Sequence, residues 1–180
     1  QLVSASRPPH KETFMDWVRW SLRVLEKSSV TVYCGHAMSG DEIWVAKGTY
    51  YTSSTGDQSS SFVLNNGVKI YGNFYGNETN INQRIDLIPN ALGSNRTNET
   101  ILSGDINLLN DSTDNANHVM YIVGNTLPVI IDGVKITGGN AMLTTGQGKG
   151  GGIYIQNAGN VILNYVIVSN NTGTEGTEGK

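Results

Sequence analysis

The chain has 180 residues and a formal net charge of −3, with 38% hydrophobic and only 15% charged side chains. This composition is too apolar for an intrinsically disordered chain, and so weakly charged a protein is unsuited to clamping nucleic acid. No apolar run reaches the roughly 18–20 residues of a membrane-spanning helix. The single cysteine, Cys34, excludes an internal disulfide framework and a multi-cysteine zinc site. We therefore expect one domain, or a piece of a larger protein.

Residues 1–38 differ from the rest and predict an atypical N-terminal cap. Thr13 followed by Asp16 fits a helix-start signal. Apolar residues then recur at three- and four-residue spacing, at Phe14, Trp17, Val18, Leu22 and Leu25. We expect a short amphipathic helix covering one end of the fold. The alternative, a membrane-surface helix, is disfavoured by the short length and mixed charge, and the charges also exclude a signal peptide as the segment stands.

From residue 40 onward the pattern is short β runs separated by polar turns. The runs are rich in β-branched or aromatic side chains. They are Ile43–Ala46, Phe62–Leu64, Val68–Tyr71, His118–Val123, Val129–Ile131, Val134–Ile136, Ile153–Ile155, Val161–Leu163 and Val166–Val168. Turn pairs such as Asp132-Gly133 lie between them, and no segment here has a sustained helical period. This part of the chain is predicted to be all-β.

The β runs repeat. Val129–Asn140 (VIIDGVKITGGN) shifted by 32 positions falls on Val161–Thr172 (VILNYVIVSNNT), with seven of twelve pairs identical or chemically close. Gly67–Gly72 (GVKIYG) also matches Gly133–Gly138 (GVKITG). The apolar residues Ile70, Leu102, Ile136 and Val168 then follow one another at steps of 32, 34 and 32 residues. These steps indicate a real period.

A repeat this short cannot bury its own core, so successive repeats must stack on one another. We predict a parallel β-solenoid with inward Val and Ile ladders, and polar ladders at Asp132/Asn164 and Thr137/Ser169. The polar segments 73–100, 105–117 and 138–152 are expected to project from one side and to carry function. A jelly-roll sandwich also uses short strands, but it would not explain the period.

Five motifs stand out along this part of the chain: Ser39–Tyr50 (SGDEIWVAKGTY), Val68–Phe74 (VKIYGNF), Ile101–Ile106 (ILSGDI), Ile131–Ala141 (IDGVKITGGNA) and Gly150–Tyr154 (GGGIY). In this order they resemble secreted bacterial right-handed parallel β-helix proteins of pectate-lyase-like fold. The Gly151–Ile153 and Val168–Asn171 elements are also similar to the short repeats of polymorphic outer-membrane proteins. The resemblance covers roughly residues 39–172. It implies a right-handed parallel β-helix, export, and a longer chain that ends in an anchoring or sorting domain.

The sequence departs from this family at both ends, and these two differences indicate where the expected domain boundaries lie. The family's Ala-rich capping helix is replaced by the charged segment 1–38, and the low-complexity tail 173–180 stands where another coil is expected. We therefore expect a cap at 1–38, β-helix coils at 39–172, a short tail, and the N-terminal piece of a larger protein.

Catalytic residues are hard to find. A β-helix lyase needs carboxylates that hold calcium, and an Arg or Lys that abstracts a proton. Asp105, Asp132, Arg84 and Arg96 are the only candidates for such a cluster, and the alternative for both aspartates is a turn role beside glycine. A glycosidase needs two carboxylates at a set separation, which no motif here enforces. The carboxylate signatures of β-helix polygalacturonases are absent, so we predict no catalytic residue.

Metal and cofactor signals are equally weak. His118 follows a run of Asn and Asp and is expected to support a coil, and His36 with Cys34 makes only two potential ligands. Gly146–Gly152 (GQGKGGG) lacks the ending of a phosphate loop and is interpreted as a flexible entry to the strand at Ile153. Five Asn-x-Ser/Thr sequons, at Asn77, Asn95, Asn98, Asn110 and Asn170, are attributed to composition. No metal site and no cofactor are predicted.

These observations favour a non-catalytic scaffold, exported or displayed on a bacterial cell surface. The expected partners are polysaccharides or host glycans. The loops are rich in Asn, Thr, Tyr and Gly, and such groups can form hydrogen bonds with sugars and stack on them. The alternative is a polysaccharide lyase or hydrolase whose active groove lies partly outside this chain. A cluster of carboxylates with a basic residue on one face would favour the enzyme.

Overall fold

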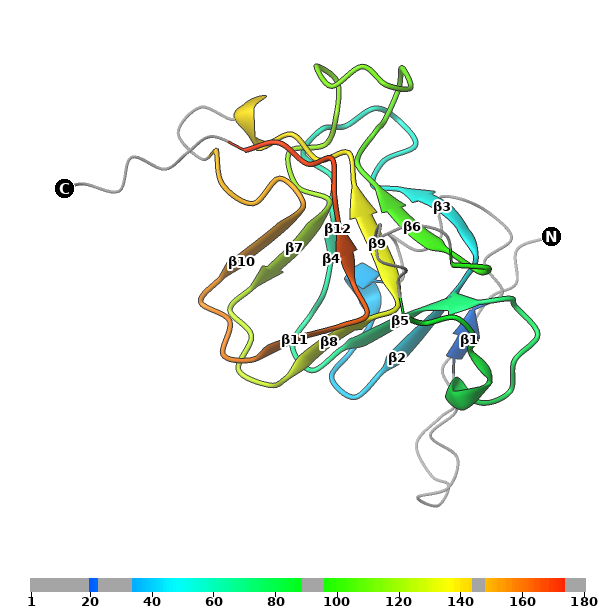
Figure 1. Ribbon diagram of the computed structural model, residues 1–180. Coiled ribbons are helices and arrows are strands. Elements are labelled where there is room, and N and C mark those ends of the chain that lie inside the picture. The colour runs from blue at the N-terminus through cyan, green and yellow to red at the C-terminus, as the bar shows by residue number, and fades with distance from the viewer. Residues whose placement is uncertain (1–19, 23–33, 89–95, 144–147, 174–180) are drawn as a thin grey trace.

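The computed structural model describes residues 20–22, 34–88, 96–143 and 148–173 (Figure 1). The described strands are β1 (Trp20–Leu22), β2 (Glu42–Ala46), β3 (Gly48–Tyr51), β4 (Phe62–Val63), β5 (Lys69–Phe74), β6 (Thr100–Ser103), β7 (Met120–Val123), β8 (Val129–Asp132), β9 (Val134–Thr137), β10 (Ile153–Gln156), β11 (Val161–Asn164) and β12 (Ile167–Val168). Two short 3-10 helices, η1 (Ile81–Gln83) and η2 (Ala141–Leu143), lie in the loops. All nine predicted β runs contain a strand.

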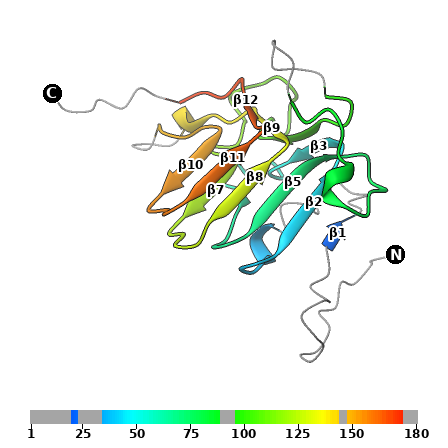
Figure 2. The same ribbon diagram turned by 60° about the horizontal axis from the view of Figure 1, so that its bottom comes forward.

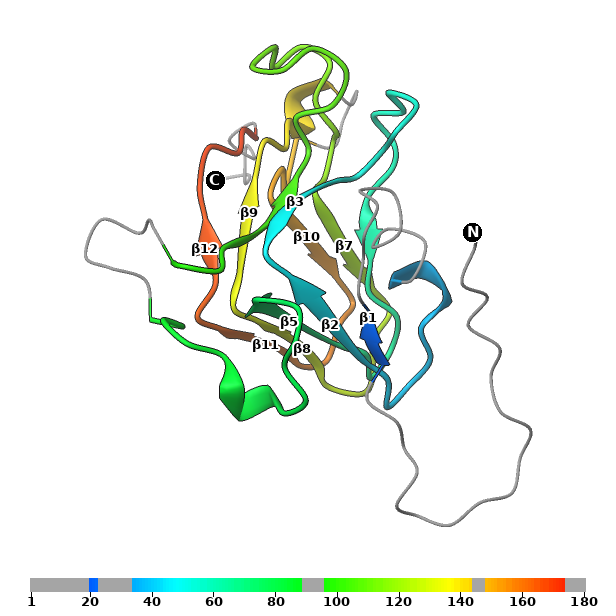
Figure 3. The ribbon, with the colours of Figure 1, turned by 90° about the vertical axis from the view of Figure 1, so that its right-hand side faces the viewer.

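The strands form three all-parallel sheets that wind into a solenoid. Sheet A has the order β1-β2-β5-β8-β11, sheet B β3-β6-β9-β12, and sheet C β4-β7-β10. The chain visits A, B and C in turn and then starts the next coil, so each sheet stacks equivalent strands of successive coils (Figures 1 and 2). Figure 3 shows the stack of sheet B from β12 to β3. The predicted parallel β-helix is confirmed.

Strand register confirms the 32-residue repeat. Val161–Asn164 pair one to one with Val129–Asp132, and Val168 pairs with Ile136, which in turn pairs with Leu102. Asp132 and Asn164 therefore are neighbours on successive coils, as predicted.

The first step of the expected period is wrong. Ile70 pairs with Ile131 in sheet A, not with Leu102, which lies in sheet B of the same coil. The GVKI motif thus occurs in strands of two different sheets. Both strands need the same alternation of inward apolar and outward polar side chains, so they resemble one another without being equivalent.

The core lies between the three sheets and consists of inward-facing ladders. One ladder per sheet runs through Ile43, Ile70 and Ile131 in A, Tyr50, Leu102 and Ile136 in B, and Phe62 and Met120 in C. All of these side chains are at most 4% exposed. Burying such side chains stabilises the fold by about 1.5–3 kcal/mol each.

The loops leave the solenoid at two corners, not one as expected. The segments after β6 and after β9 both connect sheet B to sheet C, at the top of Figure 1. Residues 75–99, which include η1, instead connect sheet A to sheet B. Arg84 and Arg96 lie in this insertion, whereas Asp105 lies in the loop after β6, at the other corner.

The N-terminal end also differs from the expectation. Trp20–Leu22 form strand β1, which pairs in parallel with Ile43–Val45 of β2, so Leu22 does not belong to an amphipathic helix. An unpaired edge of sheet A offers backbone hydrogen bonds, and these outweigh the helical spacing here. The other positions of the expected helix, from Thr13 to Leu25, lie outside the described residues.

Candidate functional site

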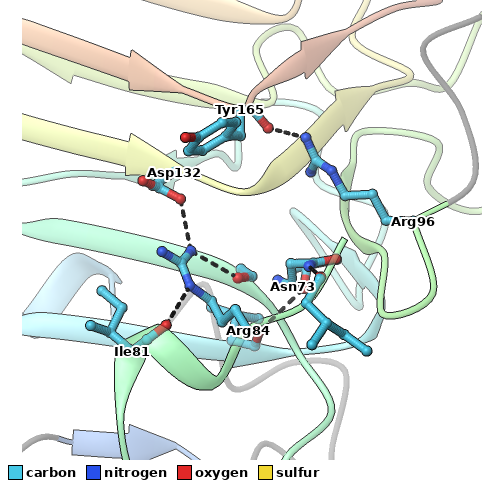
Figure 4. Close-up of polar contacts among 10 residues, drawn as sticks. Asn73, Ile81, Arg84, Arg96, Asp132 and Tyr165 are labelled. Carbon is cyan, nitrogen blue, oxygen red and sulfur yellow. Dashed lines mark hydrogen bonds and ion pairs between the residues drawn. The ribbon is translucent and has the colours of Figure 1, made fainter. Parts of the chain in front are cut away.

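The structure brings three of the four candidate charged residues to the corner between sheets A and B. Arg84 Nη1 lies 2.7 Å from Asp132 Oδ1, and Arg96 lies close by in the same insertion (Figure 4). Asp105 lies elsewhere, because it follows β6 whereas Asp132 precedes β9, at the opposite end of sheet B. The Asp105 carboxylate accepts a hydrogen bond from the backbone N–H of Asn110 within its own loop.

Arg84 anchors the insertion to the sheet. Its Nη1 also donates to the Gly72 carbonyl at 3.2 Å, and its Nε donates to the Ile81 carbonyl at 3.2 Å (Figure 4). The two side chains of the ion pair with Asp132 are 6% and 9% exposed. Charges this well buried and paired hold a loop in place, and neither group is accessible to a substrate in this arrangement.

Two further contacts fix the insertion at its start and end. Asn73, with a backbone φ of 67°, donates from Nδ2 to the Ile85 carbonyl, and its backbone N–H donates to Thr100 Oγ1. Arg96, 5% exposed, donates from Nη2 to the Tyr165 carbonyl of the last coil (Figure 4). Burial lowers the pKa of Arg96, although the nearby Glu99 and Asp132 carboxylates oppose this effect.

The insertion covers the outer face of sheet A with a second, smaller apolar cluster. Trp44 and Phe74 stack with ring centroids 4.8 Å apart, and Tyr71 completes the buried set, against which Ile81 packs. The Arg84 guanidinium lies 5.3 Å from the centroids of both Tyr71 and Phe74. The base of the insertion therefore packs against a buried apolar cluster on the outer face of sheet A.

On this base lies an open groove of about 410 Å³, lined by Lys47, Tyr75, Asn77, Glu78, Gln83, Ile85, Thr97 and Asn98. Lys47 comes from the turn between β2 and β3, and the other lining residues come from the insertion. The Lys47 Nζ lies 3.9 Å above the centroid of Tyr75, whose side chain is 58% exposed. An exposed aromatic ring beside a cation is an amphipathic binding surface.

The Glu78 carboxylate, in the lining of the groove, is hydrogen-bonded to the backbone of its own turn. Its two carboxylate oxygens accept hydrogen bonds from the backbone N–H groups of Tyr75, Gly76 and Asn77, at 2.6, 2.8 and 3.0 Å. Partial burial opposes ionisation, but the backbone hydrogen bonds together outweigh it and lower the Glu78 pKa. The carboxylate thus stabilises the turn that presents Tyr75.

Two amide side chains of the groove, those of Gln83 and Asn98, differ in how they are held. Gln83 Oε1 accepts from the backbone N–H groups of Thr79 and Asn80, which leaves its Nε2 as the outward donor. Asn98 is 3% exposed, and its buried Oδ1 accepts no hydrogen bond from the described residues. The groove therefore combines an aromatic face, a cation and amide groups, and its carboxylate is engaged with backbone.

The histidine and cysteine candidates lie far from this corner in the chain and in the fold. His118 Nδ1 lies 3.1 Å from the Gly150 carbonyl, and its ring contacts Tyr154, which stacks on Tyr121 at 5.2 Å. Cys34 is fully buried and His36 is exposed. No group of three or more His, Cys, Asp or Glu side chains in the described residues is placed to hold a metal ion.

The sequons differ in accessibility. Asn77, Asn110 and Asn170 are exposed, Asn98 is buried, and Asn95 lies outside the described residues. The Gly-rich segment ends as predicted, because β10 begins at Ile153.

Comparison with protein-family models, curated proteins and solved structures found no match. Among the described residues, no helix has the length and apolar character needed to cross a membrane.

The sequence had singled out Arg84, Arg96 and Asp132, but it missed the groove-lining pair Lys47 and Tyr75, which lie on different coils. The available signal was the run of Tyr, Asn and Glu directly after β5.

Proposed function

We propose that this β-helix is a non-catalytic module of an exported or cell-surface protein, and that it binds glycans in the groove formed by Lys47 and the insertion after β5. The observation that carries the proposal is the exposed Tyr75 ring, held by the Glu78 turn and flanked by Lys47 and amide side chains. Sugar rings offer apolar C–H faces to aromatic rings and hydroxyl groups to amides and ammonium groups.

Rigidity supports binding at this place. A preorganised site loses less conformational entropy when it binds than a mobile loop does. The insertion is anchored by Arg84 to Asp132 and by Asn73 to Ile85, so Tyr75 rises from a fixed base.

The arrangement of charges supports a non-catalytic role over the alternative of a lyase or hydrolase. Only one of the two candidate aspartates is at this corner, and its carboxylate is paired with Arg84. Both arginines donate to backbone carbonyls. A general base and a calcium-binding carboxylate set would need groups open to the substrate.

The test is an array of neutral and acidic polysaccharides, with and without calcium, probed with the native chain and with Tyr75→Ala. We expect binding of one or more glycans that weakens at least about tenfold in Tyr75→Ala, since a central aromatic contact is worth about 2 kcal/mol and each 1.4 kcal/mol is tenfold. Tyr165→Ala is the matched control, because Tyr165 is 47% exposed but lies outside the groove. Equal binding by both variants would contradict the proposed site, and release of unsaturated or reducing ends would favour the enzyme.

A further inference from the structure

The groove beside Tyr75 offers a ligand strong hydrogen-bond donors. Lys47 Nζ carries three N–H donors and no acceptor, and it forms no ion pair with any residue that the structure describes. Gln83 adds the donors of its Nε2, because its Oε1 already accepts from the backbone N–H groups of Thr79 and Asn80, at 2.7 and 2.9 Å. The groove therefore suits a ligand group that accepts hydrogen bonds.

The acceptors of the same groove are weaker or already engaged. Both oxygens of the Glu78 carboxylate accept from the backbone of residues 75–77, and Asn98 Oδ1 is buried. The acceptors that stay open are neutral oxygens, on Asn77, Thr97 and the Tyr75 hydroxyl. A hydrogen bond with a charged partner is about twice as strong as a neutral one. The Lys47 ammonium therefore favours a ligand acceptor more than these oxygens favour a ligand donor.

An aliphatic side chain lies in the same lining. Ile85 is 54% exposed, and Tyr75 is 58% exposed, so the groove has an aliphatic and an aromatic surface. A sugar hydroxyl placed against Ile85 would lose water without gaining a partner. A methyl group in the same place removes apolar surface from water on both sides. The lining thus suits a ligand that carries a small apolar group beside its acceptor.

The charges around the groove favour an uncharged acceptor. The lining holds one cation and one carboxylate, Lys47 and Glu78. A second carboxylate, that of Asp86, accepts from the Thr97 hydroxyl at 2.5 Å and so lies directly behind the lining. A carboxylate on the ligand would be attracted by Lys47 but repelled by both carboxylates. A carbonyl oxygen gains the hydrogen bond to Lys47 without this repulsion.

We propose that the groove selects glycans that carry acetyl groups, an inference that rests on the proposed glycan-binding function. An acetyl group joins an uncharged carbonyl acceptor directly to a methyl group. The carbonyl oxygen accepts from Lys47 Nζ and Gln83 Nε2, the methyl group packs on Ile85, and the sugar ring stacks on Tyr75. N-acetylated amino sugars and O-acetylated sugars share this chemistry.

Matched pairs of glycans test the selectivity with the intact chain. N-acetylglucosamine oligomers are compared by calorimetry with glucose oligomers of the same linkage and length, which have a hydroxyl in place of each acetamido group. O-acetylated xylan is compared with the same xylan after deacetylation. We expect the acetylated member of at least one pair to bind at least about tenfold more tightly, because the other member leaves the groove's donors and apolar surface without partners. The pair that differs shows whether an amide or an ester is recognised.

Two variants link this selectivity to the named contacts. Gln83→Glu keeps the Oε1 acceptor that caps η1 but removes the Nε2 donor. Ile85→Ser removes the apolar contact but keeps the backbone carbonyl that accepts from Asn73. Each should weaken binding of the acetylated glycan at least about fivefold and reduce its advantage over the matched glycan. Ile88→Ser is the control and should change neither, because Ile88 is 76% exposed and lies outside the groove.

Every other result overturns the inference. Equal binding of both members of each pair, lost in Tyr75→Ala, leaves a glycan site without selectivity for acetyl groups. A preference for acetylated glycans that neither Gln83→Glu nor Ile85→Ser reduces assigns the recognition to another place. Tighter binding of a polyuronate than of any acetylated glycan shows that Lys47 selects a carboxylate. Failure of every glycan to bind removes the proposed function together with the inference.

Discussion

Tyr165 stands at the corner between β11 and β12, where the preceding coil has Gly133. Both residues have positive φ, 51° for Tyr165 and 71° for Gly133. Only glycine adopts this left-handed region without a steric cost, which is about 1–2 kcal/mol for other residues. We expect Tyr165→Gly to raise the free energy of unfolding by about 0.5–1 kcal/mol in urea denaturation. Tyr165→Ala, which keeps the Cβ, should give no such gain, and equal stability of the two variants would contradict the strain.

The Arg84–Asp132 ion pair should behave as a coupled unit. Removing one partner leaves the other charge buried and unpaired, so Arg84→Met and Asp132→Asn should each cost about 3 kcal/mol of unfolding free energy. The double variant should cost clearly less than the sum of the two. Urea denaturation of all four proteins measures this coupling. Additive costs would show that the pair does not hold the insertion.

Cys34 makes the stability sensitive to alkaline pH. Burial raises the pKa of its thiol from 9.0 to about 12, so the folded chain keeps this proton when the unfolded chain has lost it. The contribution of the protonated Cys34 thiol to the free energy of unfolding is complete below pH 9 and is lost as the pH rises from 9 towards 12. We expect the unfolding free energy of the native chain to fall more steeply over this interval than that of Cys34→Ala. Parallel pH profiles of the two proteins would contradict the buried thiol.

At the scale of elements, two apolar residues at the same register position of sheet B differ in burial from one coil to the next. Ile136 is 0% exposed, and its register partner Val168 is 50% exposed. Ile136→Ala removes fully buried methyl groups and should cost about 2–5 kcal/mol of unfolding free energy, whereas Val168→Ala should cost less than about 1 kcal/mol in the monomer. Thermal unfolding at low protein concentration compares them. A similar cost for both would contradict the difference in burial between Ile136 and Val168.

The strands and their stacking were predictable because alternation of apolar side chains is a local signal. The 32-residue shift placed Val161 on Val129 correctly. It failed at Ile70, because the insertion after β5 lengthens that coil and the GVKI motif recurs in a different sheet. Sequence similarity between two strands therefore identified a shared pattern of burial and not a shared sheet.

The candidate site was predictable only in part, for a related reason. Asp105, Asp132, Arg84 and Arg96 were the candidates, because the two arginines are the only ones after residue 40 and each aspartate lies beside a predicted strand. The structure brings three of them to one corner and places Asp105 elsewhere. Their packing role could not be read from composition, since it depends on the backbone carbonyls of Gly72 and Tyr165. The proximity of Lys47 to Tyr75 arises from coil stacking, which the sequence does not encode locally.

At the scale of the whole molecule, the stacked strands of the solenoid are separate from the insertion that forms the groove. Each coil packs mainly on its neighbours, so a long insertion between sheets A and B leaves the ladders above and below it intact. The groove at Tyr75 is formed by this insertion and by the turn between β2 and β3, outside the stacked strands.

The measurement that tests the central claim most directly is an NMR titration of the isotope-labelled chain with the glycan that binds best. The account predicts chemical-shift changes centred on Lys47, Tyr75 and Gln83, and a glycan recovered intact after prolonged incubation. Shifts confined to other parts of the solenoid, or a cleaved glycan, would contradict it.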